Sequence, residues 1–502
     1  MTRPGNIATL IEHPDLRAIG RVADDEGCSA FVVGGVVRDR LMGRETTDID
    51  IAVSGDGVAF ARRVQAALHS SNVVAFERFG TARIQLHDRE IEFVGMRRES
   101  YTTQSRKPRV ETGTIADDLA RRDFTVNAMA VSILPGDFGA LIDPYDGFAD
   151  LERTLLRTPL DADATFSDDP LRMMRAFRFA AQLDFRIDAT ALDAITRMRD
   201  RIAIVSAERI RDEFLKMLAT PRPSRGLAPM QEAGLMAFVF PEFHQLAGVD
   251  QRSIEYPDGV RNFHHKDVFY HTLKVLDNLC AVSDDLWLRF AAILHDIAKP
   301  KTKRFVPGTG WTFHGHPELG ARMVKPIFQR FKLPLEPLPF VKKMVILHLR
   351  PIALINEEVT DAAIRRLLFD AGEDIDELLQ LCRADITSKN PKLVKRYLRN
   401  YDVLVERMRA VEERDRLRNW QPPVDGETIM RVCGLQPGIA VGILKTRIED
   451  AVLEGLIPND HDAALAYLLT IKDEVLAGPL KKKPRSKKSE LSGLPAGIRP
   501  EP

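Results

Sequence analysis

The stretch that decides the fold is FVVGGVVRD at residues 31–39, followed by TDIDI at residues 47–51. The first segment has the pattern of an apolar strand, a glycine turn and the start of a helix. Gly34 and Gly35 carry no Cβ atom, so backbone N–H groups at this turn can approach an anion closely. Arg38 follows within one helical turn and can donate to the same anion. The pattern favours a phosphate-binding turn, although a double glycine alone also fits an ordinary strand-to-helix connection.

Two carboxylates stand at positions i and i+2 of the second segment, Asp48 and Asp50. On a strand these side chains point to the same face, where they repel each other. A bound Mg²⁺ ion resolves this repulsion, because it is usually held by one or two carboxylates together with substrate phosphates. Glu92, on a predicted strand at residues 91–94, is a candidate third carboxylate. The acids and the glycine turn together predict a magnesium site beside a phosphate.

Strand signals concentrate before about residue 150, and helical spacing dominates after it. Strands are predicted at 30–33 and 49–53, a hairpin at 80–93 and a helix at 58–69. Further along, the spacing of apolar residues predicts helices at 168–183, 189–201, 206–219, 224–236, 266–282, 284–298, 317–332, 338–349, 360–371 and 374–385. We therefore expect an α+β protein, with a mixed sheet and its helices at the N-terminal end and a long all-α body behind it.

The same patterns suggest five parts along the chain. We expect a head at 1–150, a helical neck and body at 151–255, a second helical domain at 256–400, a C-terminal helical region at 401–480 and a tail at 481–502. The tail holds seven basic and two acidic residues with little to bury, which predicts disorder. It is either a solubilising tail or an electrostatic RNA tether. The basic segment between Arg97 and Arg122 has no core periodicity and is expected to be a loop.

Composition excludes several classes of protein. The 502 residues include 72 Lys+Arg and 72 Asp+Glu, which excludes a uniformly cationic nucleic-acid binder but permits local recognition. Four widely spaced cysteines without a CxxC pair exclude a zinc ribbon and a disulfide scaffold. The sequence has neither an apolar run of membrane-spanning length nor a signal peptide. A cytoplasmic protein without a membrane partner is expected.

Four ordered motifs give the chain a resemblance to a known family. After the glycine turn with TDIDI come RRDFTVNA at 121–128, SDDPLRMMRAFR at 167–178 and ERIRDEF at 208–214. This order resembles the class II tRNA nucleotidyltransferases, or CCA-adding enzymes, and the similar bacterial poly(A) polymerases. Asp168 departs from the glutamate usual in that family. The resemblance implies a polymerase-beta-like head with Mg²⁺, which adds C and A from CTP and ATP to the 3′ end of the tRNA acceptor arm without a template.

Base chemistry gives Asp169 and Arg172 a specific role within that resemblance. A carboxylate accepts from the exocyclic amine of cytosine or adenine, and a guanidinium donates to the adjacent ring nitrogen. Uracil and guanine present the opposite pattern, so such a pair selects CTP and ATP. A solvated charged helix face is the alternative interpretation. The resemblance further implies that the nucleotide is held by Gly34, Gly35, Arg38, Arg122, Asp123, Asn127, Arg175 and Arg178.

A second set of metal-ligand side chains lies between residues 260 and 390. Their order, H…HD…H…H…D, resembles the two-metal members of the HD phosphohydrolase superfamily, and the set is His271, His295, Asp296, His316, His348 and Asp385. Imidazole ligands suit divalent transition metals better than Mg²⁺. A bound metal lowers the pKa of a water molecule, which implies hydrolysis of phosphoesters, for instance at damaged RNA 3′ ends, with Lys299 at the phosphate. A degenerate domain kept for packing is the alternative.

Other functions stay open at this point. The same head motifs fit a poly(A) polymerase or a partial enzyme that adds only CC or only A. A phosphohydrolase with a head that only recruits RNA is a second class. A non-catalytic RNA-binding protein is a third, but paired acids facing a polyanion argue against it.

Overall fold

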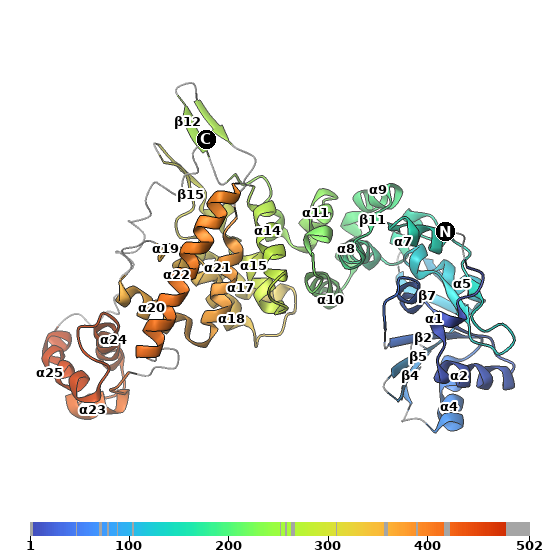
Figure 1. Ribbon diagram of the computed structural model, residues 1–502, viewed down its shortest axis with the longest axis horizontal. Coiled ribbons are helices and arrows are strands. Elements are labelled where there is room, and N and C mark those ends of the chain that lie inside the picture. The colour runs from blue at the N-terminus through green and yellow to red at the C-terminus, as the bar shows by residue number, and fades with distance from the viewer. Residues whose placement is uncertain are drawn as a thin grey trace. The chain divides into compact units, whose positions relative to one another are not determined.

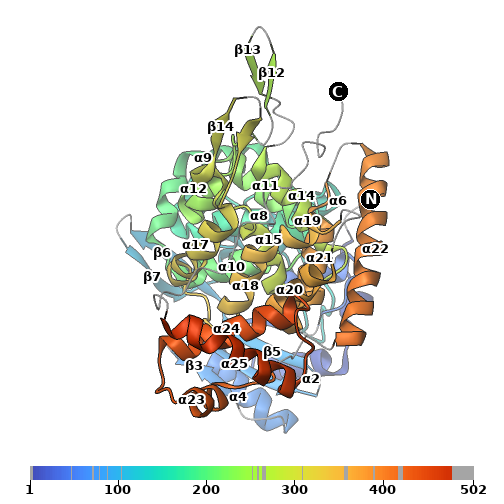
Figure 2. The ribbon, with the colours of Figure 1, turned by 90° about the vertical axis from the view of Figure 1, so that its left-hand side faces the viewer.

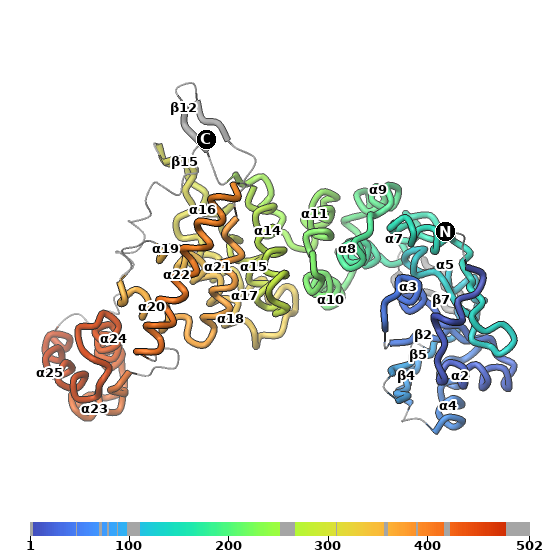
Figure 3. Tube along the Cα trace, in the orientation of Figure 1, coloured from blue at the N-terminus to red at the C-terminus, as the bar shows by residue number. Residues whose placement is uncertain are grey.

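The computed structural model describes residues 4–46, 48–69, 73–77, 80–87, 89–102, 105–250, 253–256, 259–262, 267–307, 309–355, 360–387, 390–415 and 422–477. Figure 3 traces these segments along the chain. The chain divides into two compact units, Met1–His244 and Gln245–Pro502. The predicted basic tail lies outside the described residues. Within the described part, no helix is both long and apolar enough to cross a membrane.

A mixed sheet forms the centre of the first unit, in the order β3-β4-β5-β2-β1-β8-β9 (Figure 1). Its strands are β1 (Ala30–Val33), β2 (Asp48–Val53), β3 (Val74–Phe76), β4 (Thr81–Leu86), β5 (Arg89–Gly95), β8 (Ala130–Ser132) and β9 (Leu141–Ile142). All neighbouring strands are antiparallel except β2 and β5. The parallel register of β2 and β5 sets Asp50 opposite Glu92.

Alternation along β2 separates the core from the acidic face. Ile49 and Ile51 are buried, whereas Asp48 and Asp50 alternate with them and keep surface open to solvent, Asp50 within the wall of a pocket that partly desolvates it. Helix α4 covers the sheet and begins after Asp56, whose carboxylate accepts from two backbone N–H groups of the first turn. The helices of this region are α1 (Ala8–Ile11), α2 (Pro14–Asp25), α3 (Gly35–Leu41), α4 (Gly57–Leu68), α5 (Ile115–Ala120), η2 (Thr125–Asn127) and α6 (Gly147–Glu152).

The basic segment expected to be a loop is partly a hairpin, so that prediction was wrong. Strands β6 (Arg97–Thr102) and β7 (Ser105–Thr112) pair antiparallel outside the main sheet. Backbone hydrogen bonds alone can hold such a ribbon, so its strands need not show the apolar alternation of a half-buried strand. Helix α5 follows β7 and leads into the RRDFTVNA segment.

Helices fill the remainder of the first unit, with α10 and α11 packed against α8. The elements are β10 (Leu155–Leu156), α7 (Ala162–Asp168), α8 (Leu171–Leu183), β11 (Arg186–Ile187), α9 (Ala189–Met198), η3 (Arg199–Ile204), α10 (Ala207–Leu218), α11 (Ser224–Glu232), α12 (Met236–Val239) and α13 (Pro241–His244). The four predicted helices at 168–183, 189–201, 206–219 and 224–236 correspond to α8, to α9 with η3, to α10 and to α11, whereas α7, α13 and the short strands β10 and β11 were not predicted.

The second unit is mainly helical, and Figure 2 views it with α22 standing at one edge. Its helices are α14 (Val268–Cys280), α15 (Leu286–Leu294), α16 (Lys299–Thr302), α17 (His316–Arg330), α18 (Leu338–Leu347), α19 (Arg350–Ala353), α20 (Asp361–Ala371), η5 (Gly372–Asp374), α21 (Ile375–Asp385), α22 (Pro391–Asp415), α23 (Gly426–Cys433), α24 (Ile439–Leu453) and α25 (His461–Ala477). Its strands form two hairpins, β12 (Ser253–Tyr256) with β13 (Gly259–Asn262) and β14 (Arg304–Val306) with β15 (Gly310–Thr312). The last three helices share a hydrophobic core of their own. The α+β fold class expected from the sequence is confirmed.

Candidate active sites

A pocket of about 460 Å³ opens in the first unit between the sheet and α8. This volume lies in the range of small-molecule sites. Seven arginines and three aspartates line it, so its field favours a polyanion. The lining residues are Gly35, Arg38, Asp50, Arg121, Arg122, Asp123, Asn127, Asp169, Leu171, Arg172, Arg175, Arg178, Phe179, Gln182 and Arg209.

The glycine turn lies at the edge of this pocket and needs its glycines. Gly34 has φ 77°, a left-handed conformation that side chains other than glycine rarely adopt. A Cβ atom placed on Gly34 would lie 2.5 Å from Nη1 of Arg122. Gly35 begins α3 and contributes to the pocket wall. The absence of a side chain at Gly34 therefore lets the guanidinium of Arg122 lie close to the turn.

The two head acids project from β2 as predicted, and Asp50 lines the pocket. Desolvation raises the pKa of Asp50, and the like charges of Glu92 and Asp48 add to this, while Arg122 opposes it. Glu92 forms an ion pair with Arg83 at 3.3 Å. A divalent cation would relieve the repulsion among these carboxylates, so the residues present fit a metal.

Four of the predicted nucleotide-binding residues form one hydrogen-bonded chain, which is buried except at Arg175. Arg38 donates to Oδ1 of Asn127 at 2.6 Å, and Asn127 donates to Oδ1 of Asp123 at 3.0 Å. Arg175 completes the chain with an ion pair to Asp123 at 2.6 Å. Burial by itself would raise the pKa of Asp123, but the charge of Arg175 and the hydrogen bonds outweigh it and lower the pKa to about 2. Asp123 is therefore charged and positions two arginines at the pocket wall.

Asp169 and Arg172 both line the pocket but do not pair with each other. Asp169 accepts from Arg209 at 2.8 Å, and its other oxygen accepts from the backbone N–H of Leu171 at 3.1 Å. Arg172 is buried and donates to the backbone carbonyl oxygens of Thr165 and Arg121. Each member of the predicted base-reading pair is thus held by its own partners.

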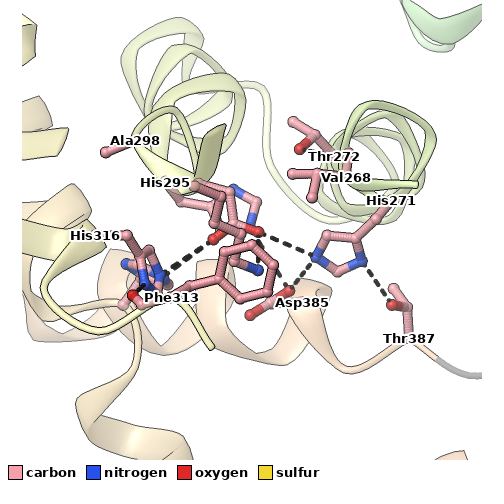
Figure 4. A network of polar contacts seen from close by, with 12 residues as sticks. Val268, His271, Thr272, His295, Ala298, Phe313, His316, Asp385 and Thr387 are labelled. Atoms are coloured by element: carbon pink, nitrogen blue, oxygen red, sulfur yellow. Dashed lines mark hydrogen bonds and ion pairs between the residues drawn. The ribbon is translucent and has the colours of Figure 1, made fainter. Parts of the chain in front are cut away.

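The second unit brings together all six side chains of the predicted HD set, and Figure 4 labels His271, His295, His316 and Asp385 among them. They come from α14, α17 and α21 and from the residues directly after α15 and α18. Their ligand atoms form two groups, each within 4.8 Å, that share Asp296: His271 and His295 on one side, His316 and His348 on the other. Asp385 lies 3.0 Å from Nε2 of His271. A carboxylate shared between two sets of imidazoles could serve as a ligand to more than one metal ion.

The four imidazoles are oriented by hydrogen bonds at Nδ1. His295, His316 and His348 each direct Nδ1 to the backbone carbonyl oxygen three residues earlier, at 2.7, 2.8 and 2.8 Å. His271 places Nδ1 3.0 Å from Oγ1 of Thr387. A carbonyl accepts only from a protonated Nδ1, so Nε2 is the nitrogen that can bind a metal, once it has lost any proton that it carries. Accordingly, Nε2 of His316 faces Nε2 of His348 at 3.4 Å.

Buried polar atoms in this cluster fit a metal. Nε2 of His295 and Oδ1 of Asp296 are buried without a hydrogen-bond partner. Burial opposes charge on His295, but Asp296 outweighs that effect and raises the pKa of His295 to about 9. Burial and the neighbouring His295 and His316 lower the pKa of His348 to about 3. The side chain of Lys299 lies at the same centre, 2.6 Å from Asp296. A divalent cation among these atoms would satisfy them, because neutral imidazole and carboxylate are its ordinary ligands.

Comparison with known proteins matches three parts of the chain. Residues 30–157 match the family "Poly A polymerase head domain", residues 184–246 match "Probable RNA and SrmB- binding site of polymerase A", and residues 268–390 match "HD domain". An A-adding tRNA nucleotidyltransferase from Deinococcus radiodurans is 31% identical over 86% of this chain and 94% of its own. The chain belongs to the tRNA nucleotidyltransferase family. A second member, the multifunctional CCA protein of Vibrio parahaemolyticus, is 31% identical over 71% of this chain and 84% of its own.

The fold agrees with that of a solved tRNA nucleotidyltransferase. The Bacillus stearothermophilus CCA-adding enzyme in complex with CTP superimposes with a TM-score of 0.61 at 23% identity, covering 92% of this chain and 99% of that one. The family membership predicted from the motifs is confirmed by the matching family models and by the relatives.

Some pocket residues of this tRNA nucleotidyltransferase were not predicted individually. Arg178 stacks on Phe179, 3.9 Å from the ring centroid, and forms an ion pair with Glu213. Gln182 accepts from Arg178 at 2.7 Å. Arg209 and Glu213 belong to the ERIRDEF motif, which was recognised as a unit. The spacing of charges at 209 and 213 on one helix face was the available signal, but their partners lie 40 and 35 residues away, respectively.

Proposed function

We propose that this chain is a template-independent tRNA nucleotidyltransferase that adds C and A from CTP and ATP to the tRNA 3′ end. One observation carries the proposal. Asp50 from β2 and the base-reading candidates Asp169 and Arg172, at the N-terminal end of α8, line the same pocket. A metal-binding carboxylate, cationic walls and a base-edge pair within one pocket match the three parts of a nucleoside triphosphate.

Asp48 and Asp50 are the residues that would hold magnesium, which activates the 3′-hydroxyl and neutralises charge on the triphosphate. The glycine turn and Arg122 would contact the phosphates, and the Arg38–Asn127–Asp123–Arg175 chain fixes the wall around them. Such catalysis works mainly by positioning the reactants and by stabilising charge. The protein therefore contributes a preformed cationic cradle in place of covalent chemistry.

Base selection can proceed without breaking the contacts of Asp169. Each carboxylate oxygen has two lone-pair sites, and in Asp169 each oxygen uses one of them, for Arg209 and for the N–H of Leu171. A lone pair remains for the exocyclic amine of C or A. Arg172 uses Nη1 and Nη2 on carbonyl oxygens and keeps further N–H groups for a ring nitrogen. The carbonyl of U or G at the amine position would instead face a carboxylate and be rejected.

A tRNA extension assay with single nucleotides tests this proposal. Purified protein, Mg²⁺ and a tRNA that ends before CCA are incubated with each NTP alone and with CTP plus ATP. We expect C addition from CTP alone and termination after CCA from the mixture. Long A tails would identify a poly(A) polymerase instead, and extension by UTP or GTP would contradict base selection by Asp169 and Arg172.

Addition of A alone is a second candidate, favoured by the similarity to the A-adding enzyme across 94% of that enzyme's length. The two candidates differ in one reaction. A tRNA ending in CC accepts A from both enzymes, whereas a tRNA lacking CCA accepts CTP only from a CCA-adding or CC-adding enzyme.

We also propose that the HD centre hydrolyses phosphoesters with two divalent transition-metal ions. The observation behind this is that Asp296 lies between two pairs of imidazoles, and that Nε2 of His295 and Oδ1 of Asp296 are buried with other members of the cluster as their polar neighbours, at 3.2 and 3.3 Å. Metal-dependent release of phosphate from a nucleotide monoester, or opening of a cyclic nucleotide phosphodiester, tests it. A protein loaded with Mn²⁺, Co²⁺, Ni²⁺ or Zn²⁺ that hydrolyses neither class would leave the domain with a packing role.

The two proposed activities suggest roles for the helical regions outside the head and the HD domain. Residues 151–255 would select the nucleotide and contact the acceptor arm, and residues 401–480 would support the RNA. All four cysteines are free thiols, which agrees with the reducing cytoplasm where we place the protein.

A further inference from the structure

A hairpin adjoins the HD centre at both of its ends. Strands β14 and β15 pair antiparallel, with Phe305 opposite Trp311. Before β14, the chain passes Asp296 and Lys299, which form an ion pair at 2.6 Å. After β15, the backbone carbonyl of Phe313 accepts from Nδ1 of His316 at 2.8 Å. Figure 4 shows the Phe313 ring with the ligand side chains. The hairpin is therefore tied to two proposed metal ligands.

One face of the hairpin combines aromatic rings with lysines. Because side chains alternate along a strand, Phe305 and Trp311 share a face, and continuing the period places Lys303 and Phe313 on it. The rings of Phe305 and Trp311 lie 5.3 Å apart at 78°. Nζ of Lys303 lies 4.3 Å from the Trp311 centroid, and Nζ of Lys299 lies 5.5 Å from that of Phe313. These ring and lysine contacts extend from the hairpin to the proposed metal centre.

The same stretch carries an uncompensated positive charge. Between Asp296 and Glu318 the sequence has four basic residues and no acidic one. Within the described residues, no ion pair joins Lys301, Lys303 or Arg304 to a carboxylate, and Lys301 and Arg304 are exposed. An aromatic pair that served only to stabilise the hairpin would not require these cations. Aromatic rings that stack bases, beside cations that meet phosphates, are the common composition of single-stranded nucleic-acid sites.

We propose that this face is a binding platform for single-stranded RNA. Bases stack on Trp311 and Phe313, Lys303 and its basic neighbours meet the backbone phosphates, and the 3′-terminal phosphoester lies at the HD centre. The substrate class of that centre is then an RNA chain end, recognised by its bases as well as by its phosphate. This inference rests on the phosphoester hydrolysis proposed above for the same centre.

Tryptophan fluorescence of the full chain, titrated with a cytidylate hexamer, tests the platform locally. We expect the RNA to quench emission in the wild type and the quenching component to be absent in Trp311→Phe. Trp311→Ala should weaken binding of the hexamer to this site by roughly 5- to 100-fold, the range found when one stacking ring is removed. Lys303→Ala should lower the salt dependence of binding by about one counterion.

Lys325→Ala is the matched control, because Lys325 is an exposed cation on α17 and its loss changes the net charge equally. Quenching that persists in Trp311→Phe, or equal binding by Lys303→Ala and Lys325→Ala, would overturn the platform. Because Trp311→Ala can disturb the hairpin, the results for Lys303→Ala and Trp311→Phe decide whether the proposal holds. Hydrolysis of a nucleotide monoester and of a cyclic nucleotide phosphodiester is measured separately. RNA quenching without such hydrolysis would remove the proposed HD activity and leave the platform standing.

Discussion

Asp169, in the break between α7 and α8, forms its ion pair with Arg209 of α10, 2.8 Å away, and not with Arg172 of α8. Arg172 is fixed instead by carbonyl oxygens of Thr165 and Arg121. The spacing between the two proposed base-reading groups is therefore set by the packing of α10 against α8 as well as by α8 itself. In the proposed function, nucleotide choice then depends on Arg209 as well, through its contact with Asp169.

Replacing Arg209 with alanine should reduce discrimination between correct and incorrect nucleotides. Asp169 would be free to rotate, and loss of one well-oriented pairing corresponds to roughly 10- to 100-fold in selectivity. The ratio of kcat/KM for CTP to that for UTP, measured on tRNA lacking CCA, reports this loss. Arg197→Ala, which removes the exposed ion pair with Asp163, is the control. An unchanged ratio in Arg209→Ala would show that Arg209 does not position Asp169.

Replacing Asp50 with asparagine should abolish nucleotide addition and spare HD hydrolysis. The amide keeps the shape of the side chain but removes the charge that a magnesium ion requires. Even the replacement of a residue that only hydrogen-bonds a metal ligand lowers metal affinity or activity by about 10- to 100-fold. We expect a loss above about 100-fold in extension rate, with phosphoester hydrolysis within twofold of the wild type. Glu77→Gln, an exposed head acid paired with Arg62, should retain addition. Extension that survives in Asp50→Asn would refute the assigned metal site.

The pKa of Asp123, lowered to about 2, predicts a stability that depends on pH. Because the pKa is lower in the folded than in the unfolded state, ionised Asp123 stabilises the fold above about pH 4. This contribution is lost as the pH falls toward 2. At 1.36 kcal/mol per unit it amounts to roughly 2 kcal/mol at neutral pH. In urea unfolding, Asp123→Asn should therefore be destabilised at pH 7 and progressively less so at pH 3.

The exposed pair of Asp163 with Arg197 provides the comparison for that experiment. Asp163→Asn should change the free energy of unfolding by less than about 1 kcal/mol at pH 7. A penalty for Asp123→Asn that is equal at pH 7 and pH 3 would mean that the charge of Asp123 does not stabilise the fold.

Chelation should separate the two proposed activities. After treatment with a chelator, protein supplied with Mg²⁺ alone should add nucleotides but hydrolyse no phosphoester, because imidazole ligands favour transition metals. Restoring Mn²⁺, Co²⁺, Ni²⁺ or Zn²⁺ should recover hydrolysis and raise the Tm of the second unit, since a ligand bound only to the folded state stabilises it. In His295→Ala, the added metal should restore neither hydrolysis nor the higher Tm. A metal content unaffected by His295→Ala would place the ion elsewhere.

Periodic features were predictable because one residue's neighbours along the chain decide them. Alternation placed Asp48 and Asp50 on one face, and the helices that carry the HD ligands followed from apolar spacing. Relationships across long sequence separations were not predictable in this way. The Asp169–Arg209 pair spans 40 residues, and nothing in either segment specifies the other. The β6–β7 hairpin was missed because its sequence lacks an apolar face.

The backbone hydrogen bonds of His295, His316 and His348 have a consequence for how such a centre can change over evolutionary time. Each imidazole is aimed by a carbonyl three residues earlier in the same segment, so no neighbouring side chain has to be retained for that purpose. Substitutions around the cluster can accumulate without turning these three rings. The residues that surround the cluster can thus change and accommodate new substrates, while the backbone at the ends of the helices keeps the three rings in the same orientation.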